Sequence, residues 1–261
     1  MKSVKCIVLG GKGLVGSSIV SRLDSNGYHV ISVDIENYND YIGEYCDVFI
    51  NANGNTYRYK ANSEPLWDYN SSVSTVVKTF SDFKYNKYFY FSTIDVYNNL
   101  YEKKSNMESV YINPAKHDYY GFHKWVSERL VEKYCLNYII LRLGTVLGDK
   151  LKKGPIYDLL NNNTLYMSIK SKLTFIDTDS IANAIMLLMV ENNSADIFNV
   201  SGTGYVEVQE LMKKYSFDSP IDKNSANDVY KYNINTQKLN ELISIDSTIN
   251  IVDRFIDSVR S

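Results

Sequence analysis

The sequence has little of several features that define other classes of protein. Its 261 residues include three cysteines, Cys6, Cys46 and Cys135, which lie far apart and show no paired spacing with one another or with the histidines. A disulfide framework or a structural zinc site is therefore not expected, and we predict no metal. Lys and Arg number 28 against 30 Asp and Glu, without a long run of one sign, so no nucleic-acid-binding surface is predicted.

Long hydrophobic runs are also missing. The longest apolar run, residues 184–190, is far shorter than the roughly 20 residues that span a bilayer. The apolar stretch at residues 6–9 is too short for a signal peptide and is interpreted as a strand. The sequence therefore predicts a cytoplasmic protein without a membrane segment, and its length predicts one or two domains.

Short runs rich in apolar and β-branched residues alternate with segments of helical periodicity. Strands are predicted at residues 4–9, 28–33, 47–52, 87–92, 137–143 and 196–200, and helices at 14–26, 68–83, 119–134 and 180–190. This alternation predicts an α/β fold with a Rossmann-type doubly wound parallel sheet.

The alternation breaks after Gly148 and again after Gly202. We therefore expect two parts. Residues 1–148, completed by about 174–200, would form a dinucleotide-binding domain, while 149–173 and 201–261 would form a small C-terminal substrate-binding lobe.

Three glycines connect the first predicted strand to the first helix. Gly10, Gly13 and Gly16 in GGKGLVG would allow a tight turn, close approach of the backbone to a pyrophosphate, and helix packing. Asp34 ends the second strand, where a carboxylate accepts hydrogen bonds from the adenine ribose. Because a carboxylate repels a 2′-phosphate, the pattern favours NAD over NADP. The alternative is a glycine-rich turn of another α/β protein, with Asp34 as an ordinary turn residue.

Tyr120 and Lys124 are four residues apart and would share one face of the predicted helix. A nearby ammonium and a positive nicotinamide ring should lower the phenol pKa from about 10 and favour the phenolate. The phenol could then pass a proton to or from a carbonyl as hydride moves. Thr93, at the end of a predicted strand, is the hydroxyl expected to orient that carbonyl. The alternative is an ordinary amphipathic helix in a chain rich in Tyr and Lys.

In this order, the motifs resemble those of the extended short-chain dehydrogenase/reductase family, the nucleotide-sugar epimerases, dehydratases and ketoreductases. GGKGLVG resembles its G-x-x-G-x-x-G loop, DVFINANG its D-V-V-I-H-x-A-A strand, STIDVYNN its S-S/T-x-x-V-Y-G segment and YYGFHK its Y-G-x-S-K. LRLGTVLG, FIDTDSIANAI and IFNVSGTGYVEVQEL are similar to later family segments, so the likeness runs from Val4 to about Leu242.

The resemblance implies three groups of site residues. The implied catalytic residues are Thr93, Tyr120 and Lys124. The implied NAD site comprises Gly10, Gly13, Leu14, Val15, Gly16, Asp34, Ala52, Asn53, Gly54, Tyr120 and Lys124. The implied contacts to a nucleotide sugar are Asn70, Asp95, Thr145 and Lys152, of which Lys152 could equally belong to a solvated charged face. The family also suggests a homodimer through the helices at 68–83 and 119–134.

Several positions depart from the family pattern. The 4,6-dehydratases carry an Asp-Glu pair after the threonine, where this chain has Ile94 and Asp95, so dehydration is disfavoured. Thr145 replaces a family asparagine. His117 and His123 flank Tyr120, and surface helix positions are favoured for them over a proton relay.

Two reactions fit these motifs, with a non-catalytic alternative. The short substrate lobe and the missing dehydratase acid favour a 4-ketoreductase. The preference for NAD favours a 4-epimerase, and the reductase is preferred only slightly. A dinucleotide-binding sensor or scaffold is the third hypothesis.

The segment 35–46 is too short for the strand and helix that relatives place there, since a crossover takes roughly 10 to 12 residues. We therefore predict that the strand at 28–33 forms the sheet edge. Residues 37–45 should form a loop or one helical turn over the adenine, with Asp40 or Tyr41 as the contacting residue.

Overall fold

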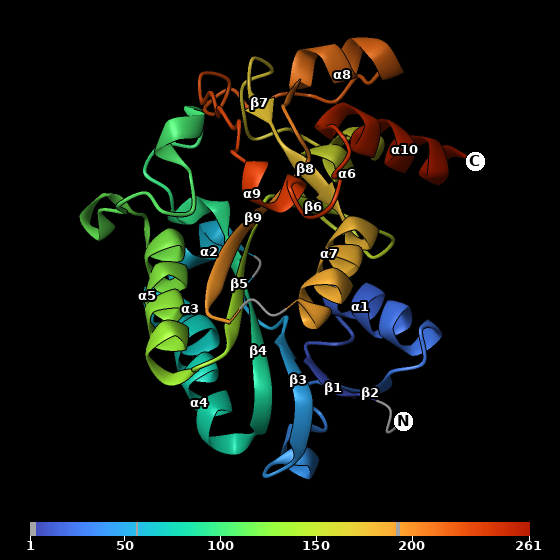
Figure 1. Ribbon diagram of the computed structural model, residues 1–261. Coiled ribbons are helices and arrows are strands. Elements are labelled where there is room, and N and C mark those ends of the chain that lie inside the picture. Colours follow the sequence, from blue (N-terminus) through green and yellow to red (C-terminus); the bar gives the residue numbers. More distant parts are fainter. Residues whose placement is uncertain (1–3, 56, 192–193) are drawn as a thin grey trace.

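The computed structural model describes residues 4–55, 57–191 and 194–261. Six parallel strands form the central sheet in the order β2-β1-β3-β4-β5-β9 (Figure 1). Their bounds are β1 (Lys5–Leu9), β2 (His29–Val33), β3 (Tyr45–Asn51), β4 (Lys84–Thr93), β5 (Tyr138–Leu143) and β9 (Asp196–Val200). The predicted doubly wound sheet is confirmed, because β1 pairs with both β2 and β3 and all of these pairings are parallel.

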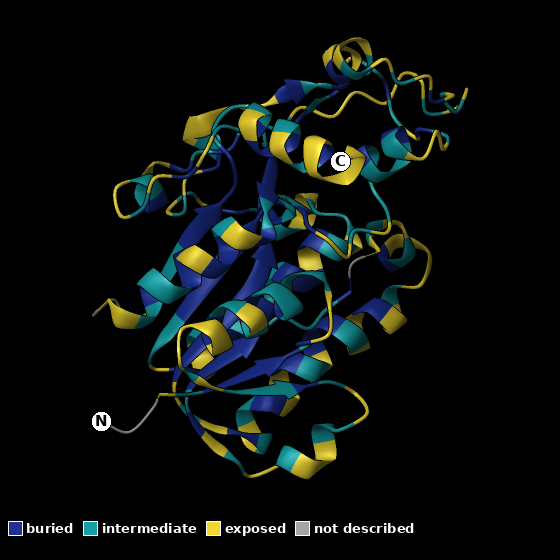
Figure 2. Cartoon of the chain, turned by 90° about the vertical axis from the view of Figure 1, so that its right-hand side faces the viewer, coloured by how far each residue is buried: buried dark blue, intermediate teal, exposed yellow. Residues whose placement is uncertain are grey.

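Helices cover both faces of the sheet. One face carries α1 (Leu14–Ser25) and α7 (Thr178–Val190), which contact each other, and the other carries α4 (Thr75–Asp82) and α5 (Tyr119–Tyr134) (Figure 1). The helix predicted at 68–83 is divided into α3 (Pro65–Tyr69), a π-helical turn (Asn70–Ser74) and α4. It is preceded by α2 (Arg58–Ser63). Buried residues concentrate on the strands in Figure 2, as expected for a sheet covered on both sides.

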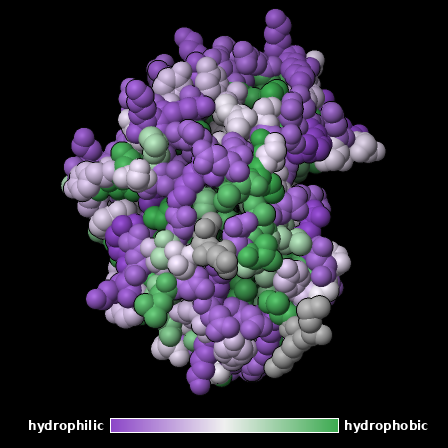
Figure 3. Space-filling model, viewed as in Figure 1, coloured by the Kyte–Doolittle hydropathy of each residue, from purple (hydrophilic) through white to green (hydrophobic). Residues whose placement is uncertain are grey.

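The remaining elements gather beyond the carboxyl ends of the central strands, at the top of Figure 1. They are the strand pairs β6 (Thr145–Leu147) with β8 (Phe175–Asp177) and β7 (Lys172–Leu173) with β10 (Val206–Glu207), and the helices α6 (Pro155–Leu160), α8 (Val208–Tyr215), α9 (Gln237–Asn240) and α10 (Thr248–Arg260). One hydrophobic cluster joins these elements to the sheet. Figure 3 shows hydrophobic side chains near the middle of the viewed face and hydrophilic ones around it.

Short 3-10 helices occur at Tyr38–Tyr41, Ile94–Val96, Lys103–Ser105 and Pro114–Lys116. The first of them confirms the predicted backbone of the short segment, because β2 is the edge of the sheet and a single turn follows it. The contact of Asp40 or Tyr41 with the adenine stays a prediction. Asn37 closes this turn: its side chain accepts from the backbone N of Asp34 at 2.7 Å and donates to the carbonyl of Ser32 at 3.1 Å.

A buried ion pair fastens α5 to the sheet. The guanidinium of Arg142 on β5 donates to both carboxylate oxygens of Glu128 on α5, at 3.0 and 2.7 Å, and to the hydroxyl of Tyr97 at 2.8 Å. Glu128 is fully buried and Arg142 is 1% exposed. Such a pair is costly to break, because a lone charge would remain in the core.

Glu128→Gln should therefore lower the free energy of unfolding by about 3–5 kcal/mol, measured by urea denaturation at neutral pH. Glu132→Gln is the matched control. Its partner Arg129 is partly exposed, so the loss should stay below about 1 kcal/mol. Equal effects of the two substitutions would contradict the role given to Glu128.

Within the described ranges, no helix is long and apolar enough to cross a membrane. The same residues contain no group of three or more His, Cys, Asp or Glu side chains placed to hold a metal ion.

Candidate active site

The glycine loop leaves β1 in a turn that only small residues can form. Gly10 has a φ of +80° and its N–H donates to the carbonyl of Val33 at 2.7 Å. A Cβ added to Gly16 would lie 2.1 Å from the carbonyl oxygen of Gly10, so helix α1 can approach the turn only with glycine there. A Cβ on Gly10 would lie 3.1 Å from the backbone of Ala52 and Asn53.

This close packing leaves backbone N–H groups available at the start of α1. Gly13 is the residue before the helix and supplies no side-chain cap. The first-turn N–H groups of Leu14, Val15 and Gly16 have no carbonyl partner within a helix, and the helix dipole adds positive potential. The loop therefore fits a pyrophosphate, as the sequence predicts.

Asp34 lies beside this loop at the end of β2. Its carboxylate accepts a hydrogen bond from the backbone N of Lys12 at 3.1 Å. The ammonium of Lys12 pairs with Glu36 at 3.1 Å. Sequence reasoning did not select Lys12, which lies within the glycine loop. The ammonium of Lys150 donates to the carbonyl of Lys12 at 3.1 Å, so two cations and two carboxylates meet at this corner and the preference for NAD rests on the Asp34 carboxylate alone.

Thr93 and Tyr120 come together where β4 ends and α5 begins. Thr93 is buried, and its hydroxyl accepts from the backbone N of Asp95 at 3.2 Å. Burial and the charge of Asp95 raise the pKa of Tyr120 above its usual range, whereas a hydrogen bond with Thr93 lowers it. This differs from the lowered phenol pKa expected from the sequence. The reason is that desolvation and the Asp95 carboxylate dominate in the chain alone.

Lys124 lies deep beside the same site. Its side chain is 5% exposed, and the ammonium donates to the carbonyl of Phe91 at 3.0 Å. Burial lowers the pKa of Lys124 to about 8, although Asp68 and Glu128 oppose that shift. A Cβ on Gly54 would lie 2.8 Å from the ammonium nitrogen. The loop after β3 and helix α5 therefore converge at Lys124, which brings two predicted parts of the cofactor site together.

A second charged cluster involves Arg58, which sequence reasoning did not select. Its guanidinium pairs with Asp95 at 3.1 Å and Asp118 at 3.0 Å, and donates to the hydroxyl of Tyr232 at 3.2 Å. Asp118 also caps α5 by accepting from the backbone N of Gly121 at 2.9 Å. Arg58 thus links the loop after β3 to the helix that carries Tyr120 and to the C-terminal residues. No local motif indicates this, since its partners are 37 to 174 positions away.

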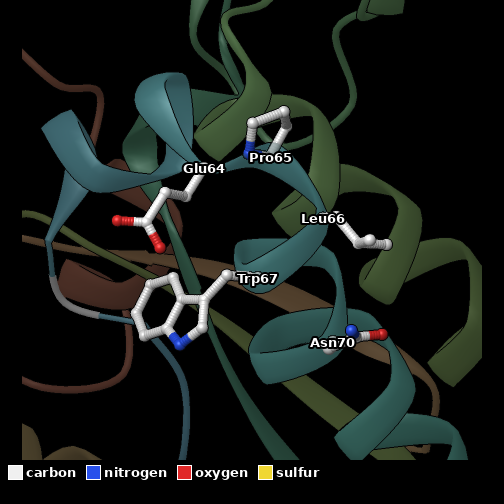
Figure 4. Close-up of a pocket in the computed structure, with 5 residues that line it drawn as sticks. All are labelled: Glu64, Pro65, Leu66, Trp67 and Asn70. Atoms are coloured by element: carbon white, nitrogen blue, oxygen red, sulfur yellow. The ribbon is translucent and has the colours of Figure 1, made fainter.

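The predicted substrate contacts do not all gather here. Asn70 is exposed, accepts from the Ser74 hydroxyl at 3.4 Å, and lines a surface hollow with Glu64, Pro65, Leu66 and Trp67 (Figure 4). Thr145 is half-buried on β6, and Lys152 is exposed. The neighbouring Lys153 lies over the ring of Tyr57 at 3.5 Å, and burial lowers its pKa to about 8.

Neither histidine occupies the surface helix position that the sequence predicts. His123 is 5% exposed, and its Nδ1 lies 2.6 Å from the carboxylate of Asp68. The position is buried because α3 and the π-helical turn pack on that side of α5. His117 is half-buried, with its Nε2 2.7 Å from the carbonyl oxygen of Val96.

Comparison with known proteins agrees with this geometry. Residues 6–201 match the family model described as "NAD dependent epimerase/dehydratase family". A sequence search of curated proteins finds no match.

Solved structures with the same fold cover nearly the whole chain. MoeE5 in complex with UDP-glucuronic acid and NAD has a TM-score of 0.83 at 16% identity, over 98% of this chain and 99% of that one. A dTDP-4-dehydrorhamnose reductase from Clostridium acetobutylicum has 0.80 at 18%, over 98% and 100%. UDP-glucose 4-epimerase from Thermotoga maritima has 0.73 at 18%, over 98% and 100%. At these identities the likeness shows the fold alone.

The burial of Lys124 predicts a specific dependence of stability on pH. The ammonium has a pKa of about 8 in the folded chain against the usual 10.5. Between these values the unfolded chain binds more protons, so stability rises with pH. Relative to Lys124→Met, the natural chain should gain about 3 kcal/mol in unfolding free energy from pH 8 to pH 10.5. Parallel pH profiles of the two proteins in urea denaturation would contradict this.

Proposed function

Because the chain belongs to the NAD-dependent epimerase/dehydratase family, we propose that it is an NAD(H)-dependent oxidoreductase acting at C4 of a nucleotide-activated sugar, as a 4-ketoreductase. The observation that carries the proposal is the convergence of Tyr120, Thr93 and Lys124 beside Gly54, at the carboxyl ends of the sheet. This is the edge of an open α/β sheet where ligands bind.

The chain's own residues fit the cofactor. Gly10, Gly13 and Gly16 supply the turn and helix end for a pyrophosphate, and Asp34 supplies an acceptor for ribose hydroxyls. The bound nicotinamide would give or take the hydride. We assign the loop Ala52, Asn53 and Gly54 to the wall of this site that faces Lys124.

The proton steps fall to Tyr120 and its neighbours. Since the pKa of Tyr120 is raised, the phenol carries its proton at neutral pH and can donate it to a carbonyl oxygen. Thr93 would orient that oxygen by a hydrogen bond. Lys124, with a pKa of about 8, is charged at neutral pH and would stabilise the phenolate that forms. Donation to a carbonyl is the proton step that reduction requires.

A 4-epimerase is the second candidate, supported by the Asp34 carboxylate, which suits NAD. NAD that stays bound through purification would indicate the epimerase, and exchangeable NADH the reductase. Binding of a dinucleotide without turnover of any nucleotide sugar would indicate the third hypothesis, a dinucleotide-binding sensor or scaffold. Dehydration remains disfavoured, because Ile94 stands at the position of the dehydratase acid.

We propose that residues 149–173 and 201–261 hold the sugar nucleotide. In support, Tyr232 contacts Arg58 and Lys153 contacts Tyr57, so both segments reach the site. Lys153 is a better candidate than Lys152 for a phosphate contact, since only Lys153 is partly buried. A homodimer through α4 and α5 stays a proposal.

Tyr120→Phe removes the proton donor and keeps the ring. Turnover of 4-keto derivatives of UDP-, GDP-, CDP- and dTDP-sugars, followed by NADH absorbance, should fall at least about 100-fold. NADH affinity should change little. Tyr119→Phe is the control, because Tyr119 is exposed on the same helix. Near-native turnover by the Tyr120 variant would exclude it as the acid.

Asp34→Ala should weaken NADH binding at least about tenfold, because ribose hydrogen bonds to a charged acceptor are lost. The natural chain should bind NADPH much more weakly than NADH, and the variant should lose this preference. Asp24→Ala, an exposed carboxylate on α1, is the control for net charge. Equal affinity of the natural chain for both cofactors in fluorescence titrations would refute the role of Asp34.

A further inference from the structure

A carboxylate outside the predicted motifs lies buried behind the site. Asp68 on α3 has no exposed surface. It accepts hydrogen bonds from the amide of Asn55 at 2.7 Å and the hydroxyl of Ser72 at 3.2 Å, and its second oxygen lies 2.6 Å from Nδ1 of His123. Because an ionised carboxylate can only accept, Nδ1 of His123 is the donor.

These three partners come from three segments that surround Lys124. Asn55 follows Gly54, the residue that abuts the ammonium of Lys124. His123 directly precedes Lys124 on α5, and Ser72 belongs to the π-helical turn. Asp68 therefore ties the loop after β3 to helix α5 at the point where they converge.

The charge of Asp68 also acts on the site. It raises the pKa of Lys124 and that of Tyr120. The other carboxylate that raises the pKa of Lys124 is Glu128, and its charge is already shared with the buried guanidinium of Arg142. Asp68 has no such cationic partner unless His123 is protonated.

The other groups near Asp68 and His123 are either aromatic rings that pack on the pair or charged residues that have partners of their own. The rings of Tyr69, Tyr119 and Phe122 lie within 6.1 Å of the His123 ring and shield it from solvent. On the opposite side of Tyr120, Asp95 and Arg58 are paired with each other. The serine in the pattern that YYGFHK resembles is replaced by His123, so the pair is a feature of this chain.

We propose that Asp68 and His123 are positioning residues for Tyr120 and Lys124. Their hydrogen bond holds helix α5 against the loop after β3, and the Asp68 carboxylate supplies the negative charge that keeps Lys124 protonated where it meets the cofactor. This inference rests on the proposed function and extends it to two residues that do not touch the reacting atoms.

Asp68→Asn removes the negative charge of the side chain and keeps its shape, so it tests the charge alone. In the cofactor-free protein, the titration of Lys124 is followed by NMR of lysine labelled at the ε-carbon, with Lys124→Met to assign the signal. The midpoint should lie near pH 8 in the natural chain and about one pH unit lower in the variant. Ser127→Ala is the control, since Ser127 is buried on α5 and bonds to Ser72 without a charge.

NADH fluorescence titrations from pH 6 to pH 9 then test the consequence for the cofactor. Asp68→Asn should bind NADH within about twofold of the natural chain at pH 6, about fivefold more weakly at pH 8 and about tenfold more weakly at pH 9. His123→Phe removes the hydrogen bond to Asp68 and keeps the Asp68 carboxylate. The affinity for NADH should therefore fall about tenfold at every pH, while the midpoint of the Lys124 titration stays in place. His123→Asn, which can still donate to Asp68, should restore binding. Thermal unfolding confirms that each variant is folded.

The outcomes distinguish this inference from the function on which it rests. An Asp68→Asn midpoint equal to the natural one overturns the inference, and so does native binding by His123→Phe. If the natural chain binds no NADH at any pH, the proposed function fails, while a shifted Lys124 midpoint would still establish the coupling to Asp68.

Discussion

The site depends on the burial of one ammonium group. Lys124 is 5% exposed, and its pKa is lowered to about 8 because desolvation disfavours the charged form. A lysine in this position would lose its proton near neutral pH unless negative groups offset the cost of burial. The groups around Lys124 provide that compensation. The backbone carbonyl of Phe91 accepts a hydrogen bond from the ammonium, and the carboxylates of Asp68 and Glu128 favour its charged form.

The two carboxylates near Lys124 have different partners, and this separates their roles. Glu128 forms a bidentate pair with Arg142 that holds α5 on β5, so most of its charge is balanced within the core. Asp68 receives neutral donors from Asn55 and Ser72, which stabilise its charge without cancelling it. Helix α5 is therefore attached to the sheet by the Glu128–Arg142 ion pair, while the charge of Asp68 raises the pKa values of Lys124 and Tyr120 on the same helix. Both carboxylates act on the helix that carries Tyr120 and Lys124.

Sequence patterns predicted the features that depend on local spacing. The alternation of strands and helices, the glycine turn, the edge position of β2 and the placement of Tyr120 and Lys124 on one helix all follow from neighbours in the chain. The missed residues share long-range contacts: Asp68 meets His123 at a separation of 55 positions, and Arg58 meets Tyr232 at 174. A lone histidine on a polar helix has no local sign of burial, so a surface position was predicted for His123. The π-helical turn that follows α3 and begins at the exposed Asn70 is equally invisible to helical periodicity.

The electrostatics of the site bear on the direction of the proposed reaction. Asp68 and Asp95 both raise the pKa of Tyr120, and Asp68 raises that of Lys124. The chain therefore rests with a proton on the phenol and another on the ammonium. A reductase needs this state, because the phenol must donate a proton to a carbonyl while a cation stabilises the phenolate that remains. An epimerase must first remove a proton from a sugar hydroxyl, which requires the phenolate at the start. The chain alone therefore rests in the protonation state from which reduction starts, and Lys124 must offset the charge of the phenolate that either reaction forms near two carboxylates.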